Sequence, residues 1–410
     1  MDKIIIAGNG IAGHSALQEI LKTHDPSDIT LIWEENKNTY MRTQLINYAV
    51  GEVPEERFFM TKGDFYKEKG IRSIQGKISS IDKEKKTVKL SSGEVLPWDK
   101  LILATGAHNF VPPVEVVGHP ILTSVDSHSI KRRPGVFTLR DLEDAKTFGQ
   151  RLKQSRKALV IGGGLLGLEA ASTLIGQGLD VTVVEFAPRL LPRQLDSTTA
   201  ALFQKETENF GAKFILGDSV KEIKYDGDTL KGVELISGKT LDCDLILFSI
   251  GIRSNLESFG ETIATDRGIV INKYTETSET NIYACGDVAQ YNGIVYGTWG
   301  FAMASGKAAG QNAAGIRTEM KPYVLNTIFN ALGTKIFSTG SVNFDDPALK
   351  SFVSGNPKSG YVKLLFKADE LVAGILMGDT SQGPKLSKSI DSRMSFNESI
   401  RTFSRESQIA

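Results

Sequence analysis

Two stretches of the sequence place glycines at the spacing G-x-G-x-x-G, directly after an apolar run and before a helical pattern. In such a loop the first glycine permits a tight turn, the second lets a pyrophosphate approach the backbone, and the third lets helix and strand pack closely. The N–H groups at the start of the helix then favour bound phosphates. Each copy predicts a dinucleotide-binding loop, formed by Gly8, Gly10, Ile11, Ala12 and Gly13 in the first copy and by Gly162, Gly164, Leu165, Leu166 and Gly167 in the second.

An acidic residue stands about 20 residues after each motif, at or next to the end of the following apolar run. A carboxylate in this place accepts hydrogen bonds from ribose hydroxyls and repels a 2′-phosphate. Glu185 ends its strand directly, which favours NADH over NADPH in the second copy, although Arg189 could still tolerate a phosphate. In the first copy Trp33 takes the matching position, so Glu34 is the candidate acid and Glu35 is its alternative.

The elements that must position these loops follow an alternating pattern. Apolar runs suited to strands buried on both faces alternate with helical segments, which indicates parallel sheets of the βαβ type. We therefore expect an α/β fold with two Rossmann-like dinucleotide-binding domains and a small α+β C-terminal domain. The predicted strands are Lys3–Ala7, Ile29–Trp33, Leu101–Ala104, Ala158–Ile161, Val181–Glu185 and Leu245–Ile250, and the predicted helices are Ser15–Thr23 and Leu165–Gln177.

The same pattern suggests domain boundaries. We expect the first dinucleotide-binding domain over residues 1–118 and 248–320, the second over 119–247 and the C-terminal domain over 321–394. A proline-containing connection, residues 111–134, separates the two glycine units. Alternating stretches at Tyr361–Phe366 and Leu371–Met377 predict an antiparallel sheet in the third domain. Residues 395–410 are polar and lack periodicity, which predicts a loose tail.

Composition excludes several classes of protein. Lys plus Arg and Asp plus Glu each number 48, so a general nucleic-acid binder is not expected. The two cysteines, Cys243 and Cys285, are too few for a four-cysteine cluster or zinc site and fit a reducing cytoplasm. No apolar run approaches a membrane span, and residues 1–7 predict a first strand rather than a signal peptide. We expect no metal site and no membrane partner, and either a monomer or a homodimer.

Two further segments carry a family resemblance. One apolar strand ends in A-T-G at residues 104–106, and a later one ends in A-C-G-D at residues 284–287. With the two glycine motifs, these segments resemble the FAD-dependent pyridine nucleotide–disulfide oxidoreductases over about residues 1–390. The resemblance implies that the first unit binds FAD, that the second binds NADH or less readily NADPH, and that the C-terminal domain packs near the flavin. It assigns FAD contacts to Ala104, Thr105, Gly106, Gly286 and Asp287, the last of these to the ribityl chain.

Finer features resemble the branch that contains NADH:rubredoxin oxidoreductases and the flavin domain of nitrite reductases. Residues 40–45, Y-M-R-T-Q-L, resemble its Y-x-R-x-x-L segment, in which the arginine, here Arg42, contacts FAD. Residues 137–144 resemble the start of its NADH domain, where Arg140 also touches FAD. A surface salt bridge is the alternative for both arginines. The other cofactor contacts that the resemblance assigns are Thr43, Ile78, Arg193, Gly251, Gly297, Thr298 and Trp299, the last of which fits a core position equally well.

Missing residues distinguish this chain within the resemblance. Disulfide reductases carry C-x-x-x-x-C after the first unit, and NADH peroxidases carry a cysteine near the position of Thr43, but this chain has neither. A thiol relay is therefore not expected; Cys285 fits a small buried structural residue, and Asp242 and Asp244 should make Cys243 a poor thiolate. Glu169 matches a glutamate beside the flavin in ferredoxin reductases, whose lysine partner is replaced here by Asn47. We predict Glu169 at the nicotinamide–flavin junction, with helix packing as the alternative.

The resemblance implies a flavin reaction. NADH would pass hydride to FAD, and the electrons would go directly to an external one-electron carrier such as rubredoxin or ferredoxin. The N–H groups of a helix that opens at residues 299–305 could stabilise negative charge on the reduced flavin. The alternatives are an NADH oxidase or diaphorase, an electron-input subunit of a nitrite reductase-type complex, and an NADH-responsive redox sensor.

Overall fold

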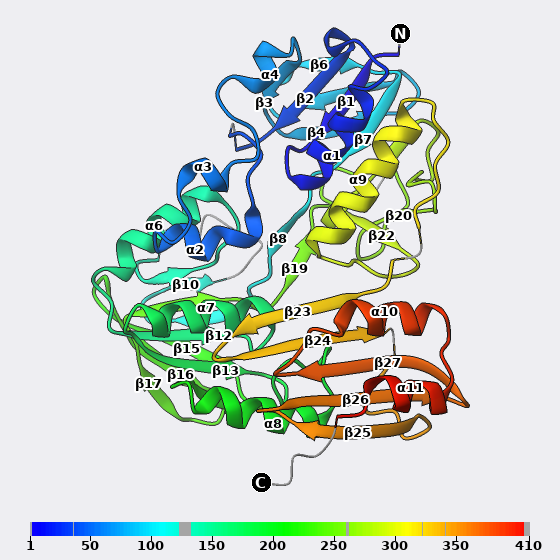
Figure 1. The fold of residues 1–410 in the computed structure, drawn as a ribbon. Coiled ribbons are helices and arrows are strands. Elements are labelled where there is room, and N and C mark those ends of the chain that lie inside the picture. The colour runs from blue at the N-terminus through cyan, green and yellow to red at the C-terminus, as the bar shows by residue number, and fades with distance from the viewer. Residues whose placement is uncertain are drawn as a thin grey trace. The chain divides into compact units, whose positions relative to one another are not determined.

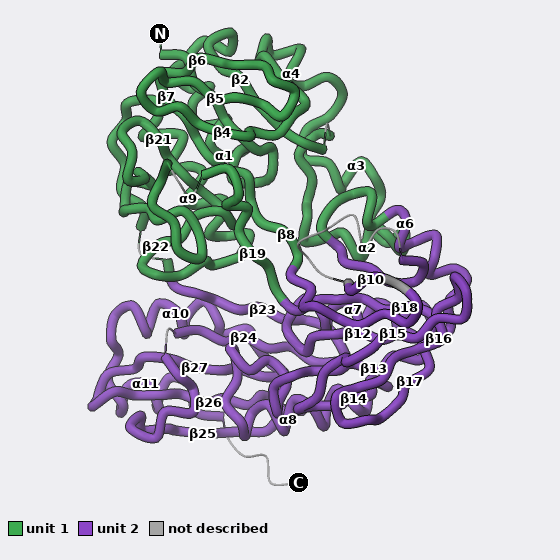
Figure 2. Tube along the Cα trace, turned by 180° about the vertical axis from the view of Figure 1, so that it is seen from behind, with its two compact units in different colours: residues 1–109, 140–145, 251–323 green, residues 110–139, 146–250, 324–410 purple. Residues whose placement is uncertain are grey.

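The computed structural model describes residues 2–35, 37–122, 133–259, 262–321, 323–340 and 342–405. The chain divides into two compact units, each built from segments that are distant in the sequence (Figure 2). Unit 1 contains residues 1–109, 140–145 and 251–323, and unit 2 contains residues 110–139, 146–250 and 324–410. Each glycine motif therefore lies in a different unit. None of the helices in the described parts of the chain combines the length and apolar character that a membrane crossing requires.

Unit 1 is built around a parallel sheet with the strand order β21-β7-β1-β2-β3 (Figure 1). Helix α1 (Ile11–Ile20) follows β1, and α9 (Trp299–Ala313) packs along α1. The strands of this sheet are β1 (Ile4–Ala7), β2 (Ile29–Trp33), β3 (Arg72–Gln75), β7 (Lys100–Leu103) and β21 (Ile282–Ala284).

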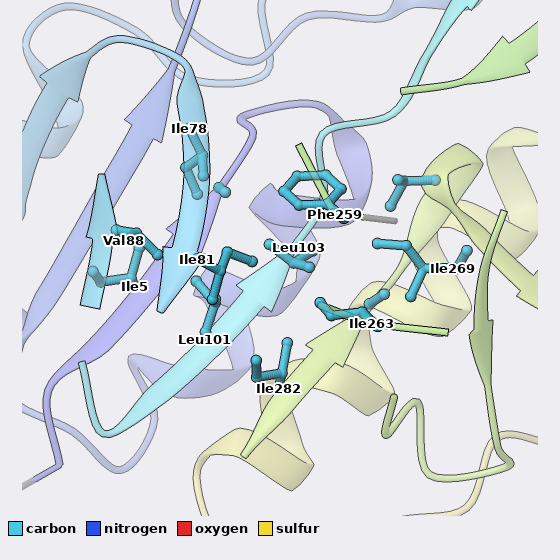
Figure 3. Packing of buried hydrophobic residues seen from close by; sticks show 14 of the residues in the cluster. Ile5, Ile78, Ile81, Val88, Leu101, Leu103, Phe259, Ile263, Ile269 and Ile282 are labelled. Atoms are coloured by element: carbon cyan, nitrogen blue, oxygen red, sulfur yellow. The ribbon is translucent and has the colours of Figure 1, made fainter. Parts of the chain in front are cut away.

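Smaller elements complete unit 1. An antiparallel sheet, β4-β5-β6, covers one face of the parallel sheet through buried aliphatic side chains such as Ile78 and Val88 (Figure 3). These smaller elements are η1 (Pro26–Asp28), η2 (Arg42–Gln44), α2 (Leu45–Ala49), α3 (Glu55–Phe58), α4 (Phe65–Glu68), β4 (Ile78–Asp82), β5 (Thr87–Leu90), β6 (Val95–Pro97), β8 (Ala107–Asn109), β19 (Ile252–Ser254), β20 (Ile269–Ile271), η3 (Gly286–Val288) and β22 (Ala289–Tyr291).

Unit 2 repeats the same design around a second parallel sheet, β11-β18-β12-β13-β14. A mixed sheet, β10-β9-β15-β16-β17, packs against it through buried residues such as Val116, Ile223 and Ile246. The elements are β9 (Val114–Val116), β10 (His119–Leu122), β11 (Val136–Phe137), α6 (Leu142–Leu152, which begins among the residues of unit 1), β12 (Lys157–Ile161), α7 (Leu165–Gly176), β13 (Asp180–Glu185), α8 (Ser197–Glu208), β14 (Lys213–Leu216), β15 (Val220–Asp226), β16 (Thr229–Leu235), β17 (Thr240–Asp242) and β18 (Leu245–Phe248).

The C-terminal part of unit 2 is an antiparallel sheet in the order β23-β24-β27-β26-β25. Its apolar face packs against two helices, with Phe337, Leu364 and Phe403 among the buried residues. The elements are β23 (Asn326–Ala331), β24 (Thr334–Gly340), β25 (Lys350–Asn356), β26 (Gly360–Lys367), β27 (Glu370–Met377), α10 (Gly383–Asp391) and α11 (Phe396–Phe403).

The predicted fold class is confirmed, and the predicted strands match within two residues at each end. Three details differ. The first helix begins at Ile11 rather than Ser15, because the glycine loop opens directly into it with Gly10 as its N-cap. The connection over residues 111–134 contains β9 and β10, and β9 pairs with β15. The expected loose tail is wrong for residues 396–403, which form α11.

Candidate functional site

The glycine loop of unit 1 has the geometry that a pyrophosphate requires. Gly8 has a φ of +112°, and a Cβ there would lie 2.1 Å from the Ala104 carbonyl oxygen. A Cβ at Gly13 would lie 1.9 Å from the Gly8 carbonyl oxygen, so no side chain fits at either position. A Cβ at Gly10 would meet nothing within 4 Å. The crowded glycines hold strand and helix together, while the open one leaves its backbone accessible to a ligand.

The helix that follows this loop begins without a cap from a side chain. Gly10 is the N-cap of α1, no described side chain accepts a hydrogen bond there, and the first turn contains no acidic residue. The first N–H groups of a helix lack partners inside the helix and carry its positive dipole end. The N–H groups of Ile11 and Ala12 lie at this helix start, where an anion would be favoured.

The two candidate acids of unit 1 differ in their partners. The Glu35 carboxylate accepts hydrogen bonds from Arg42 Nη2 at 2.6 Å and from the Tyr40 hydroxyl at 2.5 Å. Glu34 is exposed, and its carboxylate has neither a hydrogen bond nor an ion pair within the described residues. Glu34 is thus the acid whose oxygens are open to a ribose, and Glu35 orients Arg42.

Four predicted residues from distant segments meet in unit 1. Arg42 donates through Nη1 to the Arg140 carbonyl oxygen, and Arg140 pairs through Nη2 with Asp287 Oδ2 at 3.1 Å. A Cβ at Gly106 would lie 3.3 Å from Arg140 Nη2. Burial, followed by the positive charge of Arg42, lowers the pKa of Arg140 from its ordinary value. An anion bound beside the two guanidinium groups would relieve this repulsion.

The A-T-G turn after β7 presents a polar atom with no partner in the described residues. The Thr105 hydroxyl is buried and makes no hydrogen bond there, which would cost free energy unless a ligand or water completes it. Asn255 fixes this turn, because its Nδ2 donates to the Thr105 carbonyl at 2.9 Å and its backbone N–H donates to the Gly106 carbonyl at 3.1 Å. Sequence reasoning missed Asn255, since nothing in its local sequence indicates this turn as its partner.

The start of α9 is held by hydrogen bonds within unit 1. Thr298 is the N-cap of α9, accepts a hydrogen bond from the Phe301 N–H at 3.4 Å, and shares another with the Tyr323 hydroxyl at 3.0 Å. Gly297 has a φ of +58°. Trp299 is half-buried at the start of α9, and both the cofactor contact and the core position expected for this side chain stay predictions.

Small residues let α9 approach α1 closely. A Cβ at Gly306 would lie 2.3 Å from the Ala12 carbonyl oxygen, and one at Gly310 would lie 2.4 Å from the Ala16 carbonyl oxygen. Ser305 Oγ accepts a hydrogen bond from the Gly286 N–H at 3.0 Å. This packing brings the N-terminus of α1, the Gly286–Asp287 turn and the part of α9 around Ser305 and Gly306 together. Sequence reasoning predicted the helix that opens at residues 299–305 but missed the spacing of Gly306 and Gly310 as a packing signal.

The three remaining predicted residues of unit 1 have different surroundings: Ile78 is buried, Thr43 is exposed, and Gly251 lies in open space. Ile78 is 3% exposed, its side chain packs in the core shown in Figure 3, and its carbonyl oxygen accepts a hydrogen bond from Ser258 Oγ. A cofactor contact at Ile78 could therefore involve only its main chain. Thr43 is exposed on η2, which also holds Arg42. Gly251 has a φ of +103°, and a Cβ there would meet nothing within 4 Å.

The glycine loop of unit 2 repeats the geometry of unit 1. Gly162 has a φ of +116°, and a Cβ there would lie 2.3 Å from the Ser249 carbonyl oxygen. A Cβ at Gly167 would lie 2.1 Å from the Gly162 carbonyl oxygen, whereas Gly164 again meets nothing within 4 Å. Gly164 caps α7, whose first turn contains no acid and begins with Leu165 and the exposed Leu166. This loop also fits a pyrophosphate.

Glu185 is anchored at the edge of that loop. Its Oε2 accepts a hydrogen bond from the Gly163 N–H at 2.5 Å, and its Oε1 accepts one from the Ala187 N–H at 2.7 Å. Each carboxylate oxygen keeps a further lone pair for a ribose hydroxyl. Arg193 is exposed, whereas Arg189 pairs with Asp345 at 2.8 Å. Arg189, which could have tolerated the extra phosphate of NADPH, is thus paired with Asp345.

The predicted catalytic residue, Glu169, is half-buried on α7. Its carboxylate has no hydrogen-bond or ion-pair partner among the described residues, and burial raises its pKa above the ordinary value of 4.5. Asn47, on α2 of unit 1, donates through Nδ2 to Gln44 Oε1 at 2.8 Å. A carboxylate without a partner and with a raised pKa is typical of a functional site, and the placement of Glu169 at the nicotinamide–flavin junction stays a prediction.

Both cysteines are buried free thiols. Burial raises the pKa of Cys285 to about 12. Burial, followed by the charges of Asp244 and Asp242, raises the pKa of Cys243 to about 12. The predicted poor reactivity of Cys243 is confirmed in direction, and burial contributes more than the neighbouring charges.

The chain is similar to known redox proteins. Residues 2–310 match the family described as pyridine nucleotide-disulphide oxidoreductase, and residues 326–394 match the rubredoxin NAD+ reductase C-terminal domain. A nitrite reductase [NAD(P)H] of Bacillus subtilis is 33% identical over 97% of this chain and 48% of its own length. An NADH-rubredoxin oxidoreductase of Clostridium acetobutylicum is 30% identical over 96% of each chain. The chain spans about half the length of several curated relatives, including nitrite reductases.

A solved structure supports the same relationship. The crystal structure of NADH:rubredoxin oxidoreductase from Clostridium acetobutylicum superposes with a TM-score of 0.81 and 28% identity, covering 98% of this chain and all of that one.

Proposed function

Because the chain belongs to the pyridine nucleotide–disulphide oxidoreductase family, we propose that it is an FAD-dependent NADH:acceptor oxidoreductase of the rubredoxin reductase type. One observation carries this proposal. Both units contain a glycine loop with the same crowded and open positions, and each loop leads into an uncapped helix. Two dinucleotides, one bound by each unit, therefore fit this chain. We also propose the three-domain boundaries expected above, with FAD in residues 1–118 and 248–320 and NADH in residues 119–247.

The residues of unit 1 fit FAD. The N–H groups at Ile11 and Ala12 would hold the pyrophosphate, Glu34 the ribose, and the Thr105 hydroxyl a polar atom of the cofactor. Asp287, oriented by Arg140, would accept hydrogen bonds from the ribityl hydroxyls. The N-terminus of α9, capped by Thr298, would place N–H groups near the flavin ring. When bound, FAD supplies the hydride-accepting and electron-releasing chemistry, and the protein orients it.

The residues of unit 2 fit NADH. Gly164 leaves room for the pyrophosphate, and the anchored Glu185 carboxylate would accept hydrogen bonds from the ribose hydroxyls. The same carboxylate would repel the additional phosphate of NADPH, so NADH is the preferred donor. Glu169, without a partner and with a raised pKa, would hold or release a proton as the charge of the site changes.

The electron acceptor is an external one-electron carrier, with rubredoxin as the first choice and ferredoxin as the second. The C-terminal sheet matches the domain named for rubredoxin reductases, and NADH-rubredoxin oxidoreductase is similar over nearly the whole chain. Cys243 and Cys285 are buried with pKa values of about 12, which argues against a thiol relay. Buried free thiols also fit a reducing compartment, and we place the enzyme in the cytoplasm, as a monomer or homodimer.

The decisive experiment is anaerobic reduction followed by separate additions of acceptor. We expect NADH to bleach the flavin absorbance, reduced rubredoxin to form rapidly, and oxygen to reoxidise the flavin slowly. A Cys243→Ser/Cys285→Ser variant is the matched control and should transfer electrons at the native rate. No bleaching by NADH would overturn the proposal, and rapid reoxidation by oxygen with inert rubredoxin would make the protein an NADH oxidase.

A second candidate function is that of an electron-input module in a nitrite reductase-type complex, and the length of a relative favours it. The similar nitrite reductase of Bacillus subtilis is about twice as long as the region it shares with this chain. Slow reoxidation by both rubredoxin and oxygen would favour an electron-input module of such a complex.

A further inference from the structure

The turn after β13 carries an arginine whose charge is already paired. Arg189 forms an ion pair with Asp345, with 2.8 Å between Nη2 and Oδ2, and Nη2 also donates to the Pro192 carbonyl oxygen at 3.3 Å. Asp345 lies in the connection between β24 and β25 of the C-terminal sheet. The side chains of Arg189 and Asp345 are 27% and 32% exposed. Partial burial weakens solvent screening, so this pair should hold more firmly than a fully exposed one.

Asp345 is fixed from its other side as well. Its Oδ1 accepts hydrogen bonds from the Ser197 N–H at 2.9 Å and from Ser197 Oγ at 2.7 Å, at the first turn of α8. The preceding residue, Asp196, is buried and pairs with the mostly buried Lys363 of β26 at 2.7 Å. The C-terminal sheet region therefore contacts the segment between β13 and α8 through two ion pairs, Asp345 with Arg189 and Lys363 with Asp196.

That segment borders the candidate NADH loop. The Leu191 N–H donates to the Gly163 carbonyl oxygen at 3.0 Å, and a Cβ at Gly163 would lie 2.8 Å from Leu190 Cδ2. Glu185 accepts its hydrogen bond from the N–H of the same glycine. Leu190 and Leu191 thus lie against the loop where Glu185 would bind the adenosine ribose, and Arg189 directly precedes them in the chain. In NADPH sites an arginine near this position accommodates the 2′-phosphate.

We propose that Asp345 is a specificity-determining residue, which holds Arg189 away from the 2′-phosphate of NADPH. The C-terminal domain then sets the coenzyme choice together with Glu185, and this inference rests on the proposed function. A 2′-phosphate could recruit Arg189 only by breaking its pair with Asp345, and it would still face the Glu185 carboxylate. Removing the charge of Asp345 frees the arginine.

The test measures binding of adenosine 2′,5′-bisphosphate and of 5′-AMP to the holoenzyme by calorimetry. In Asp345→Asn the amide oxygen still accepts from Ser197, whereas the charge that pairs with Arg189 is gone. We expect adenosine 2′,5′-bisphosphate to bind about tenfold more tightly, the size of one charge-assisted hydrogen bond, with 5′-AMP unchanged. The ratio of kcat/KM for NADPH over NADH should rise by a similar factor.

Asp180→Asn is the matched control, because Asp180 begins β13, pairs with the exposed Lys213 at 2.6 Å and carries the same charge. An effect in Asp345→Asn no larger than that in Asp180→Asn would overturn the inference. A gain that persists in Asp345→Asn/Arg189→Ala would also overturn it, since Arg189 must be the group that is freed.

A third variant keeps the test valid if Asp345→Asn does not fold. Arg189→Ala alone should leave the affinity for adenosine 2′,5′-bisphosphate unchanged, because the arginine is already committed. A tenfold loss would overturn the inference. A native protein that binds 5′-AMP and is reduced by NADH retains the proposed function whatever the variants show. A native protein that does neither overturns both proposals.

Discussion

The pair of Arg140 and Asp287 joins two segments of unit 1 that lie far apart in the sequence. Their side chains are one quarter exposed or less, and Gly106 leaves space beside the guanidinium. Asp287→Ala removes both this pair and the proposed ribityl acceptor. We expect FAD to dissociate about tenfold more readily, measured as flavin per chain after gel filtration. Asp266→Ala, which removes an exposed acid from the same unit, should keep its flavin, and full flavin in Asp287→Ala would contradict the assignment.

Glu169 makes stability depend on pH in a direction that can be measured. Burial raises its pKa above 4.5, so the folded state holds its proton more tightly than the unfolded state. Ionisation therefore costs stability as the pH rises above the unfolded value. In Glu169→Gln we expect the gain in Tm over the native protein to grow between about pH 4 and pH 7. An equal difference in Tm at both pH values would show that packing alone explains the effect.

At the scale of elements, the contact between α1 and α9 is set by glycines. A Cβ at Gly310 would lie 2.4 Å from the Ala16 carbonyl oxygen, which belongs to a backbone that cannot move aside cheaply. Gly310→Ala should lower the free energy of unfolding by about 1–3 kcal/mol and reduce flavin content, because it separates the helices that frame the loop. Gly176→Ala, at an open position of α7, should be neutral or slightly stabilising. Equal stability of the two variants in urea unfolding would contradict this account.

Helix α11 lies in a segment that the sequence analysis predicted as a loose tail. Ser395 caps it by accepting from the Glu398 N–H at 3.4 Å, which is the S-x-x-E start signal, and Phe403 is buried in the C-terminal cluster. The helix has only eight residues, so its apolar positions look scattered in a polar segment. Tertiary burial of Phe403 rather than local propensity stabilises so short a helix.

At the scale of the whole molecule, the two units should respond differently to loss of FAD. A ligand stabilises only the structure that binds it, by about 4 kcal/mol when its concentration is 1,000 times Kd. We expect hydrogen exchange after flavin removal to increase in α1 and α9 of unit 1. The antiparallel sheet of β25–β27 in unit 2 should keep its protection, since its core is separate. Equal loss of protection in both units would contradict the placement of FAD.

The sequence by itself determined the two nucleotide-binding loops and the fold class. Their signals are local, because a glycine spacing and an apolar run depend only on backbone sterics and on burial of consecutive residues. Gly8, Gly13, Gly162 and Gly167 are required for reasons that the crowded carbonyl contacts confirm. The absence of a thiol near Thr43 is equally readable in the sequence.

The tertiary structure alone decided which charges meet. The pairing of Arg140 with Asp287 and the support of Thr105 by Asn255 join residues that are distant in the sequence, whereas Glu35 differs from Glu34 through its contact with the nearby Arg42. The commitment of Arg189 to Asp345 belongs to the same class. Local sequence patterns cannot predict such partners, because the position of a charged residue in the sequence does not indicate which opposite charge it will contact in the fold. Only folding fixes which carboxylate comes within hydrogen-bond distance of which arginine.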